Sequence, residues 1–214
     1  MHLDDFDELI TYMTRGMEPY RGFPQFLRAA ALVLQERPKA RVVIAGDDRV
    51  AYGLPLPSGD SWKQRLLAEL GTSLDLSRVH FVGTLLYRDY LRVLQASTVH
   101  AYLTVPFVLS WSLLEAMATG CVIVGSDTPP LREVIDHGEH GLLGDFFDHE
   151  DLARRMIAVL ADPAGHRHLG QAARRRVIER YESRRCVNAQ IELLGDLAAG
   201  RPPKQLEIAG RQAE

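Results

Sequence analysis

Two arginines, Arg15 and Arg21, stand near the start of the chain, and each is followed directly by a glycine. They lie between a short apolar run and an amphipathic stretch, so we expect them on a strand-to-helix loop. Guanidinium groups make paired contacts to phosphate oxygens, and glycine lets a backbone come close to a neighbour. The pattern indicates a site that could neutralise a diphosphate; the alternative is two solvated loop charges.

A second candidate site lies where a loop runs into a helix between Leu103 and Gly120. The helix is expected to begin near Ser110, and the free N–H groups at a helix start attract phosphate. Glu115 falls about one turn inside this helix, close enough to accept hydrogen bonds from sugar hydroxyls. Otherwise it is a surface or capping carboxylate.

Short runs rich in Val, Ile and Leu alternate with amphipathic stretches, the pattern of a parallel sheet with crossover helices. The predicted strands are Ile10–Thr14, Arg41–Ala45, Val79–Val82, Val99–Leu103, Val122–Gly125 and Gly141–Leu143. The helices predicted between them are Pro24–Glu36, Trp62–Leu70, Arg88–Ala96, Trp111–Thr119 and Leu131–Asp136. Ligands of such sheets bind beyond the carboxyl ends of the strands, where both candidate sites fall.

After Asp148 the pattern changes to helices alone, predicted at His149–Ala161, His166–Tyr181 and Glu182–Ala199. The predicted fold class is therefore α/β, a Rossmann-like doubly wound parallel sheet with a C-terminal helical tail. Residues 1–199 are interpreted as one domain and residues 200–214, which are polar, as a flexible tail. The loop from Asp47 to Ser61 is unusually long, which is typical of functional or disordered segments.

Several short motifs occur in an order that resembles one family. They are the two Arg-Gly pairs, Ala-Gly-Asp-Asp, Val-His-Phe-Val-Gly, Leu-Leu-Glu-Ala-Met-Ala-Thr-Gly, Ser-Asp-Thr-Pro-Pro and His-Gly-Glu-His-Gly-Leu-Leu. From about Ile10 to Tyr181 the chain is similar to the C-terminal domain of the group 1, retaining GT-B glycosyltransferases. The resemblance implies one half of a GT-B fold that binds a nucleotide-diphosphate sugar as donor substrate, with no further cofactor and no metal ion.

The resemblance also assigns the diphosphate end of the site. Arg15 and Arg21 stand where the family's two cations hold the donor diphosphate, with arginine at Arg21 in place of the usual lysine. The helix-start amides at Leu109, Ser110 and Trp111 resemble the loop that holds the phosphate and the hexose. No catalytic residue is assigned.

The nucleoside end follows in the same way, with one departure. Glu115 matches the family's ribose-binding glutamate, and Thr84 and Leu85 fall where backbone groups recognise the nucleobase. The family's other glutamate, which contacts the transferred sugar, corresponds here to Phe107, which accepts no hydrogen bond. This departure puts the identity of the sugar, and activity itself, in question.

Nothing in the chain resembles the N-terminal, acceptor-binding half of a GT-B enzyme. We therefore expect that half to come from a preceding domain or a partner chain, and expect little activity from this chain alone. An exposed cleft face could also be covered by a second copy in a homodimer. The alternative function is a non-catalytic nucleotide-binding or protein-interaction module; an NAD-dependent oxidoreductase is disfavoured because no GxGxxG follows a predicted strand, and a nucleotide-sugar epimerase stays open.

Composition excludes several other classes. A formal net charge of −3 disfavours nucleic-acid binding, and no apolar run approaches the roughly 18–20 residues of a transmembrane segment. Cys121 and Cys186 belong to no metal-binding pattern, which favours a reducing, cytoplasmic setting. The carboxylates Asp47 and Asp48 lack a ligand set for a metal. The histidines of the loop region, His137, His140 and His149, lack zinc spacing and are expected to be exposed.

Overall fold

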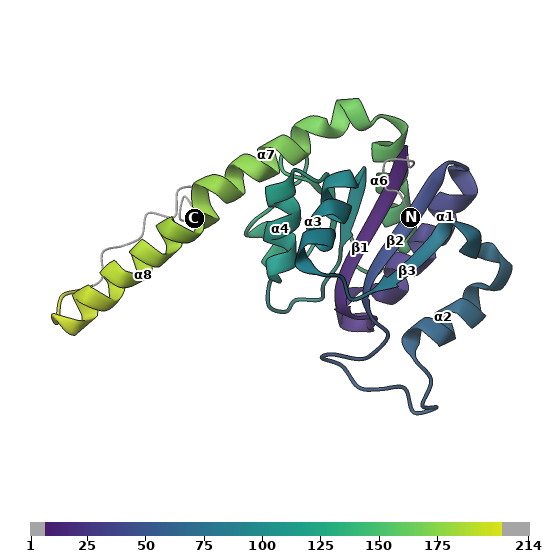
Figure 1. Cartoon of the computed structure of the whole chain (residues 1–214), viewed down its shortest axis with the longest axis horizontal. Coiled ribbons are helices and arrows are strands. Elements are labelled where there is room, and N and C mark those ends of the chain that lie inside the picture. Colours follow the sequence, from purple (N-terminus) through teal and green to yellow (C-terminus); the bar gives the residue numbers. More distant parts are fainter. Residues whose placement is uncertain (1–6, 203–214) are drawn as a thin grey trace. The chain divides into compact units, whose positions relative to one another are not determined.

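The computed structural model describes residues 7–202, and its elements follow the predicted alternation of strands and helices. Among these residues, six parallel strands form one sheet in the order β3-β2-β1-β4-β5-β6. The strands are β1 (Glu8–Gly16), β2 (Ala40–Asp47), β3 (Val79–Gly83), β4 (Val99–Tyr102), β5 (Ile123–Ser126) and β6 (Leu142–Gly144). The predicted Rossmann-like, doubly wound sheet is therefore confirmed (Figure 1).

Helices connect these strands and follow the last of them. They are α1 (Phe23–Glu36), α2 (Trp62–Leu70), α3 (Tyr87–Ala96), α4 (Trp111–Thr119), α5 (Pro129–Arg132), α6 (His149–Ala161), α7 (Pro163–Tyr181) and α8 (Ser183–Ala198). None of the described helices is long and apolar enough to cross a membrane.

The chain divides into two compact units, Met1–Arg175 and Arg176–Glu214. The first unit contains the whole sheet, and the second contains the end of α7 and all of α8, which buries none of its side chains. The predicted helical C-terminal region is confirmed. The predicted domain end at residue 199 stays a prediction, and residues 203–214 of the predicted flexible tail lie outside the described residues.

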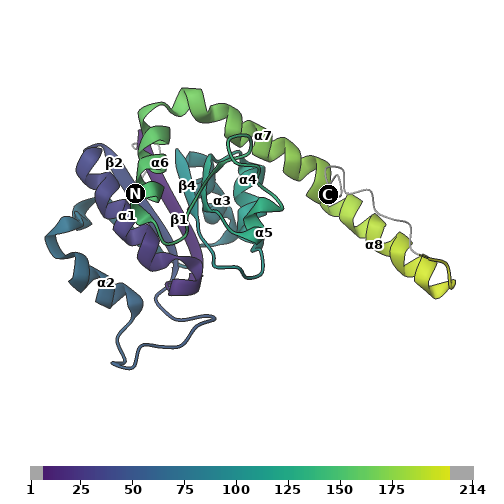
Figure 2. The same cartoon turned by 180° about the vertical axis from the view of Figure 1, so that it is seen from behind.

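Within the first unit, helices cover both faces of the sheet. On one face α1 packs against α6 and α2 (Figure 2), and on the other α3 packs against α4 (Figure 1). The larger part of the core lies under α1, where the ring of Tyr12 stacks on that of Phe26 with centroids 4.4 Å apart. Strands covered on both faces are mostly apolar, which explains why these strands are rich in Val, Ile and Leu.

The order of the strands reverses between β1 and β4, which are neighbours in space although two strands separate them in sequence. The connection after β1 leads to one face and the connection after β4 to the other. At such a switch point the two loops diverge and leave a crevice beyond the strand ends. Both predicted site segments begin at this crevice.

Local sequence explains where the helices beside the crevice begin and end. The Ser61 side chain accepts a hydrogen bond from the backbone of Gln64, whose side chain bonds back to Ser61, a capping box that starts α2. Ser110 caps α4 by accepting from the backbone N–H of Ser112, and Gly120 terminates it, so the helix has the predicted bounds Trp111–Thr119.

Two predicted helix bounds are wrong. The helix expected at Leu131–Asp136 instead spans Pro129–Arg132, because two prolines with fixed φ start the turn early. The helix expected from His166 begins already at Pro163, because proline suits a first turn and the Asp162 carboxylate accepts from the backbone N–H of Gly165 at 2.9 Å. Asp162-Pro163 thus separates two helices without a loop between them.

A fully buried histidine lies in the centre of the sheet. His100 on β4 shares a hydrogen bond of 2.8 Å between its Nδ1 and the Thr11 hydroxyl, which lies 2.7 Å from the Ser97 hydroxyl. Its Nε2 has no partner among the described residues. Burial lowers the pKa of His100 to about 4, because a charged imidazolium would be poorly solvated there.

This histidine predicts a loss of stability in mild acid. Below its ordinary pKa of about 6.5 the unfolded chain binds a proton that the native state binds only near pH 4, so the free energy of unfolding falls as pH falls between these values. The loss attributable to His100 approaches about 3 kcal/mol at pH 4. Urea unfolding at several pH values should show this slope in the wild type and a shallower one in His100→Asn. His168→Asn, at an exposed position, should keep the wild-type slope; equal slopes in all three proteins would contradict the prediction.

Candidate functional site

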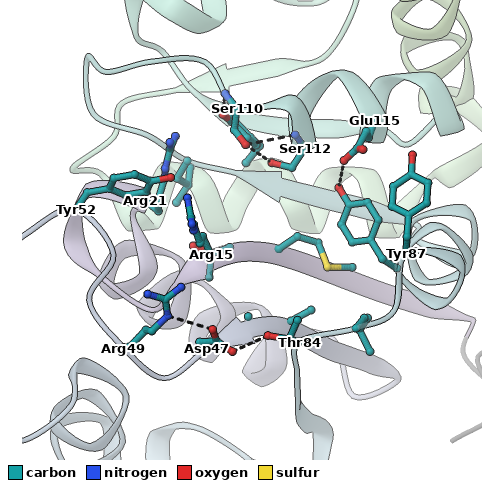
Figure 3. Close-up of a pocket in the computed structure, with 18 residues that line it drawn as sticks. Arg15, Arg21, Asp47, Arg49, Tyr52, Thr84, Tyr87, Ser110, Ser112 and Glu115 are labelled. Atoms are coloured by element: carbon teal, nitrogen blue, oxygen red, sulfur yellow. Dashed lines mark hydrogen bonds and ion pairs between the residues drawn. The ribbon is translucent and has the colours of Figure 1, made fainter.

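A cavity of about 510 Å³ opens at the carboxyl ends of β1, β2 and β4, at the switch point of the sheet. The loops after β1, β2 and β3 and the start of α4 supply its walls. Of the residues predicted to form the site, six line it: Arg15, Arg21, Thr84, Leu85, Ser110 and Glu115. Figure 3 shows the two arginines and Ser110 at one end and Glu115 at the other.

Two predicted residues do not line the cavity. Leu109 and Trp111 are absent from its walls, and the Trp111 side chain is 83% exposed. Both were assigned through their backbone amides at the start of α4, so the position of their side chains does not test that role. They stay predictions for phosphate binding.

Arg21 is the most highly organised cation of the cavity. Its guanidinium donates to the Thr104 hydroxyl at 3.1 Å and to the Val108 carbonyl at 3.4 Å. The same group lies 5.1 Å from the ring centroid of Tyr52 and 5.5 Å from that of Phe107. Aromatic faces attract a cation and limit its rotation, so Arg21 is held in place without using a carboxylate.

Arg15 is exposed at the end of β1 and faces the same space. Among residues 7–202, neither Arg15 nor Arg21 forms an ion pair with an acidic side chain. Two guanidinium groups with no carboxylate between them give this end of the cavity uncompensated positive charge. An anion with several oxygens could accept hydrogen bonds from both guanidinium groups and balance their charge.

The glycines after the two arginines serve packing rather than an approach to a ligand. A Cβ at Gly22, which has φ of +68°, would lie 2.5 Å from the Leu103 Cβ, and a Cβ at Gly16 would lie 2.6 Å from the Arg49 carbonyl oxygen. Both distances are far below contact distance, so the loops after β1, β2 and β4 pack closely only because these positions are glycine.

The start of α4 provides polar groups above the arginines. The Ser110 backbone N–H donates to the Tyr102 hydroxyl at 2.9 Å, and the Ser110 and Ser112 hydroxyls lie 2.8 Å apart. Both serines line the cavity (Figure 3). Hydroxyls and the helix start therefore face the same space as the guanidinium groups, and all of them favour an anion.

Glu115 lies at the other end of the cavity with two tyrosines. The Tyr90 hydroxyl donates to the Glu115 carboxylate at 2.9 Å, and the rings of Tyr87 and Tyr90 stack with centroids 6.0 Å apart. Burial, reinforced by the charge of Glu115, raises the pKa of Tyr90, so its hydroxyl keeps its proton and stays a donor. One carboxylate oxygen of Glu115 is thereby fixed, while the group still faces the cavity.

The floor of the cavity carries a second carboxylate. Asp47 accepts from the Thr84 hydroxyl at 2.5 Å and from Arg49 Nε at 3.1 Å (Figure 3). The hydrogen bond from Thr84 and the one from Arg49 lower the pKa of Asp47, which is therefore ionised at neutral pH. These contacts tie Thr84, predicted beside the nucleobase, to the end of β2.

The sequence did not predict the tyrosines of the site, and it did not predict the role of Asp47 on the cavity floor. Tyr52, Tyr87, Tyr90 and Tyr102 line the cavity, and none was singled out. Asp47 was considered only as a metal ligand, although it acts here as an acceptor for hydroxyl and guanidinium donors. The unusual length of the loop after Asp47 was the one signal that could have pointed to Tyr52.

One histidine expectation is wrong. His140 is buried with 7% of its surface exposed, because it packs in the turn that follows α5. Asp136, Glu139 and His140 lie close enough together to hold a metal ion. Exposed acidic groups commonly cluster without one, and this group lies outside the cavity.

The fold and the cavity together define a Rossmann-like domain whose switch point carries two arginines with no acidic partner in the described part of the chain. The profile of the family "Glycosyl transferases group 1" matches residues 3–176. The chain therefore belongs to the group 1 glycosyltransferases, as its motifs predicted.

Individual proteins are also similar to this chain, in sequence or in fold. Putative glycosyltransferase EpsD of Bacillus subtilis is 29% identical over 178 residues, which are 83% of this chain and 43% of that protein. Sucrose-phosphate synthase of Thermosynechococcus elongatus is similar with a TM-score of 0.74 and 25% identity, over 94% of this chain and 47% of that one. HepE of Anabaena, solved in complex with UDP-glucose, has a TM-score of 0.71 and 19% identity, over 92% of this chain and 50% of that one. The chain spans less than half the length of the curated relatives it matches.

Proposed function

We propose that this chain is the donor-binding domain of a glycosyltransferase that transfers a sugar from a nucleotide-diphosphate sugar to an acceptor. An acceptor-binding domain outside this chain, or a partner chain, would complete the enzyme. The observation that carries the proposal is the pair of guanidinium groups, Arg15 and Arg21, that face one cavity and have no carboxylate partner among residues 7–202. A solved relative that holds UDP-glucose in a similar fold supports it.

The polarity of the cavity suits such a donor from end to end. Arg15, Arg21 and the start of α4 would hold the diphosphate and stabilise its negative charge as it leaves the sugar. Glu115 would accept hydrogen bonds from the ribose hydroxyls, since its carboxylate is oriented by Tyr90. Thr84 and Leu85 would lie beside the base.

The proposal includes no metal ion and no further cofactor, because the cationic side chains supply the charge that a metal would otherwise provide. It places the chain in a reducing cytoplasmic compartment, which its free cysteines, Cys121 and Cys186, fit. The exposed Val108 and Trp111 beside the cavity suit contact with the completing domain, or with a second copy of this chain.

A non-catalytic nucleotide-binding module is the second candidate, and one observation favours it. Phe107 presents an aromatic ring to Arg21 at the diphosphate end, where a sugar would need hydrogen-bonding groups. Such a module would bind the diphosphate and transfer nothing. Hydrolysis or transfer of a bound donor by the completed protein would exclude it.

The test is a calorimetric panel of UDP, GDP, ADP and their common sugar conjugates, with and without EDTA. We expect one nucleoside diphosphate to bind saturably, and we expect EDTA to leave its affinity unchanged. Failure of every ligand to bind would overturn the proposal for the chain as it stands.

A second prediction concerns Glu115. Glu115→Ala should weaken binding of the preferred ribonucleoside diphosphate by about tenfold and remove any preference over its 2′-deoxy analogue, because the carboxylate accepts from ribose hydroxyls. Glu133→Ala, at an exposed position outside the cavity, is the matched control and should change neither. A ribose preference that survives in Glu115→Ala would contradict the assignment.

A further inference from the structure

The loop that follows β2 is anchored by a buried carboxylate. Glu18 has 0% of its surface exposed, and its side chain accepts from the backbone N–H of Tyr52 at 3.0 Å and of Gly53 at 2.8 Å. A buried carboxylate is costly unless donors surround it, and backbone N–H groups are strong donors. Glu18 therefore fixes the backbone of Tyr52 although the two residues are far apart in sequence.

This anchor places an aromatic ring at the cationic end of the cavity. The Tyr52 ring centroid lies 5.1 Å from the Arg21 guanidinium carbon and 5.4 Å from the Phe107 centroid, so the two rings contact each other and both lie beside Arg21. Figure 3 shows Tyr52 beside Arg21 and on the same side of the cavity as Arg15. Tyr52 still has 39% of its surface exposed, so it borders the space that a ligand would occupy.

A phenol suits this position better than a purely apolar ring, because it carries a hydroxyl group. The hydroxyl group of tyrosine both donates and accepts, so it can donate to an anion held by guanidinium groups. Burial alone would raise the pKa of the Tyr52 phenol, but the neighbouring Arg15 and Arg21 guanidinium groups outweigh it, so the pKa lies below its ordinary value. Figure 3 shows the phenol end of Tyr52 directed toward the two arginines.

We infer that Tyr52 is a phosphate-binding residue of this cavity, and that Glu18 is the positioning residue that holds it there. The inference rests on the proposed function, since the ligand is the diphosphate of a nucleotide. When the anion binds, the phenol O–H donates to a phosphate oxygen between Arg15 and Arg21. The rings of Tyr52 and Phe107 keep the Arg21 guanidinium directed at the same group.

Calorimetry with UDP, GDP and ADP on five variants tests both parts: Tyr52→Phe, Tyr20→Phe, Glu18→Gln, Tyr52→Ala and the double variant Glu18→Gln/Tyr52→Ala. Tyr52→Phe keeps the ring and removes only the donor, and it should weaken binding of the preferred diphosphate by about tenfold. Tyr20→Phe is the matched control, because Tyr20 is exposed in the same segment as Arg21 but does not line the cavity. Glu18→Gln should weaken binding by a smaller factor in the wild type and by none in Tyr52→Ala, since it acts through Tyr52.

A spectroscopic readout separates a ligand contact from a structural role. In mildly alkaline solution, the ultraviolet absorbance of ionised tyrosine should fall when the diphosphate binds, because the anion neutralises the two arginines and raises the pKa of Tyr52. The change should be absent in Tyr52→Phe and retained in Tyr20→Phe.

Failure of this inference can be distinguished from failure of the proposed function. If Arg21→Ala loses the diphosphate while Tyr52→Phe binds it as tightly as the wild type, the inference is wrong and the proposed function stands. If the wild type binds none of the three diphosphates, both are overturned. An equal effect of Glu18→Gln with and without the Tyr52 side chain would reject the positioning role of Glu18.

Discussion

Replacing Arg15 and Arg21 together by alanine is expected to reduce the affinity for a nucleoside diphosphate by at least about 100-fold. A hydrogen bond between charged partners contributes about 1.5–3 kcal/mol, and each tenfold change in affinity corresponds to about 1.4 kcal/mol. The two guanidinium groups have no acidic partner among the described residues, so under the proposed function the diphosphate would supply the negative charge that pairs with them. Calorimetric titration of both proteins with UDP, GDP and ADP measures the difference.

The matched control removes the same net charge elsewhere. Arg88 and Arg92 on α3 have side chains that are 72% and 66% exposed, and neither lines the cavity. The double variant Arg88→Ala/Arg92→Ala should bind nearly as well as the wild type, since exposed charges at a distance are screened by salt. Arg21→Lys should fall between the extremes, because lysine keeps the charge but loses the planar fork. Similar losses in both double variants would mean that overall charge, rather than a built site, attracts the ligand.

The sheet and its order of elements could be predicted from the sequence because period and punctuation carry that information. Runs such as Arg41–Ala45 are apolar without alternation, which is the pattern of a strand covered on both faces. The arginines at Arg15 and Arg21 could be placed at the strand ends for the same reason. The bounds that failed, at Pro129 and Pro163, lie where proline starts a helix rather than ending one.

The aromatic side of the site could not be predicted, because its contacts join segments that are distant in sequence. The backbone N–H of Tyr52, in the loop after β2, donates to Glu18, in the connection after β1, and Tyr90 on α3 donates to Glu115 on α4. A tyrosine in a loop or on a helix surface has no pattern of its own that would announce such a partner. The resemblance to a family gave roles to residues within motifs, and these tyrosines lie outside them.

Phe107 differs from the family in sequence and lies beside Arg21 in the structure. In the sequence it is a departure from the family, because it replaces a residue that accepts hydrogen bonds. In the structure it lies 5.5 Å from the Arg21 guanidinium and helps to orient it. Under the proposed function, the departure would remove a polar group from the sugar end and support Arg21 at the diphosphate end. Under the proposed function, this arrangement would favour recognition of the nucleotide diphosphate over recognition of the sugar attached to it.

Gly46→Ala is expected to cost about 3 kcal/mol of stability, the largest effect of any single substitution considered for the fold. Gly46 has φ of +137° at the end of β2, a conformation that alanine rarely adopts. A Cβ there would also collide with the backbone carbonyl of Thr14, directly before Arg15. Since β1 and β2 are neighbours in the sheet and their register shifts between Met13 and Gly16, relief of the collision must separate their carboxyl ends.

A second glycine, Gly59, separates the cost of the backbone conformation from the cost of the collision. Gly59 has φ of +79°, but a Cβ added there would meet nothing within 4 Å, so Gly59→Ala should lose only about 1–2 kcal/mol from backbone strain. Urea unfolding of both variants measures the difference, which isolates the close approach of Thr14 to Gly46. Diphosphate binding, measured in water on the folded fraction, should fall in Gly46→Ala alone, because only that change displaces Arg15. Equal losses of stability in the two variants would mean that the strand ends can separate freely, and that the cavity does not depend on their contact.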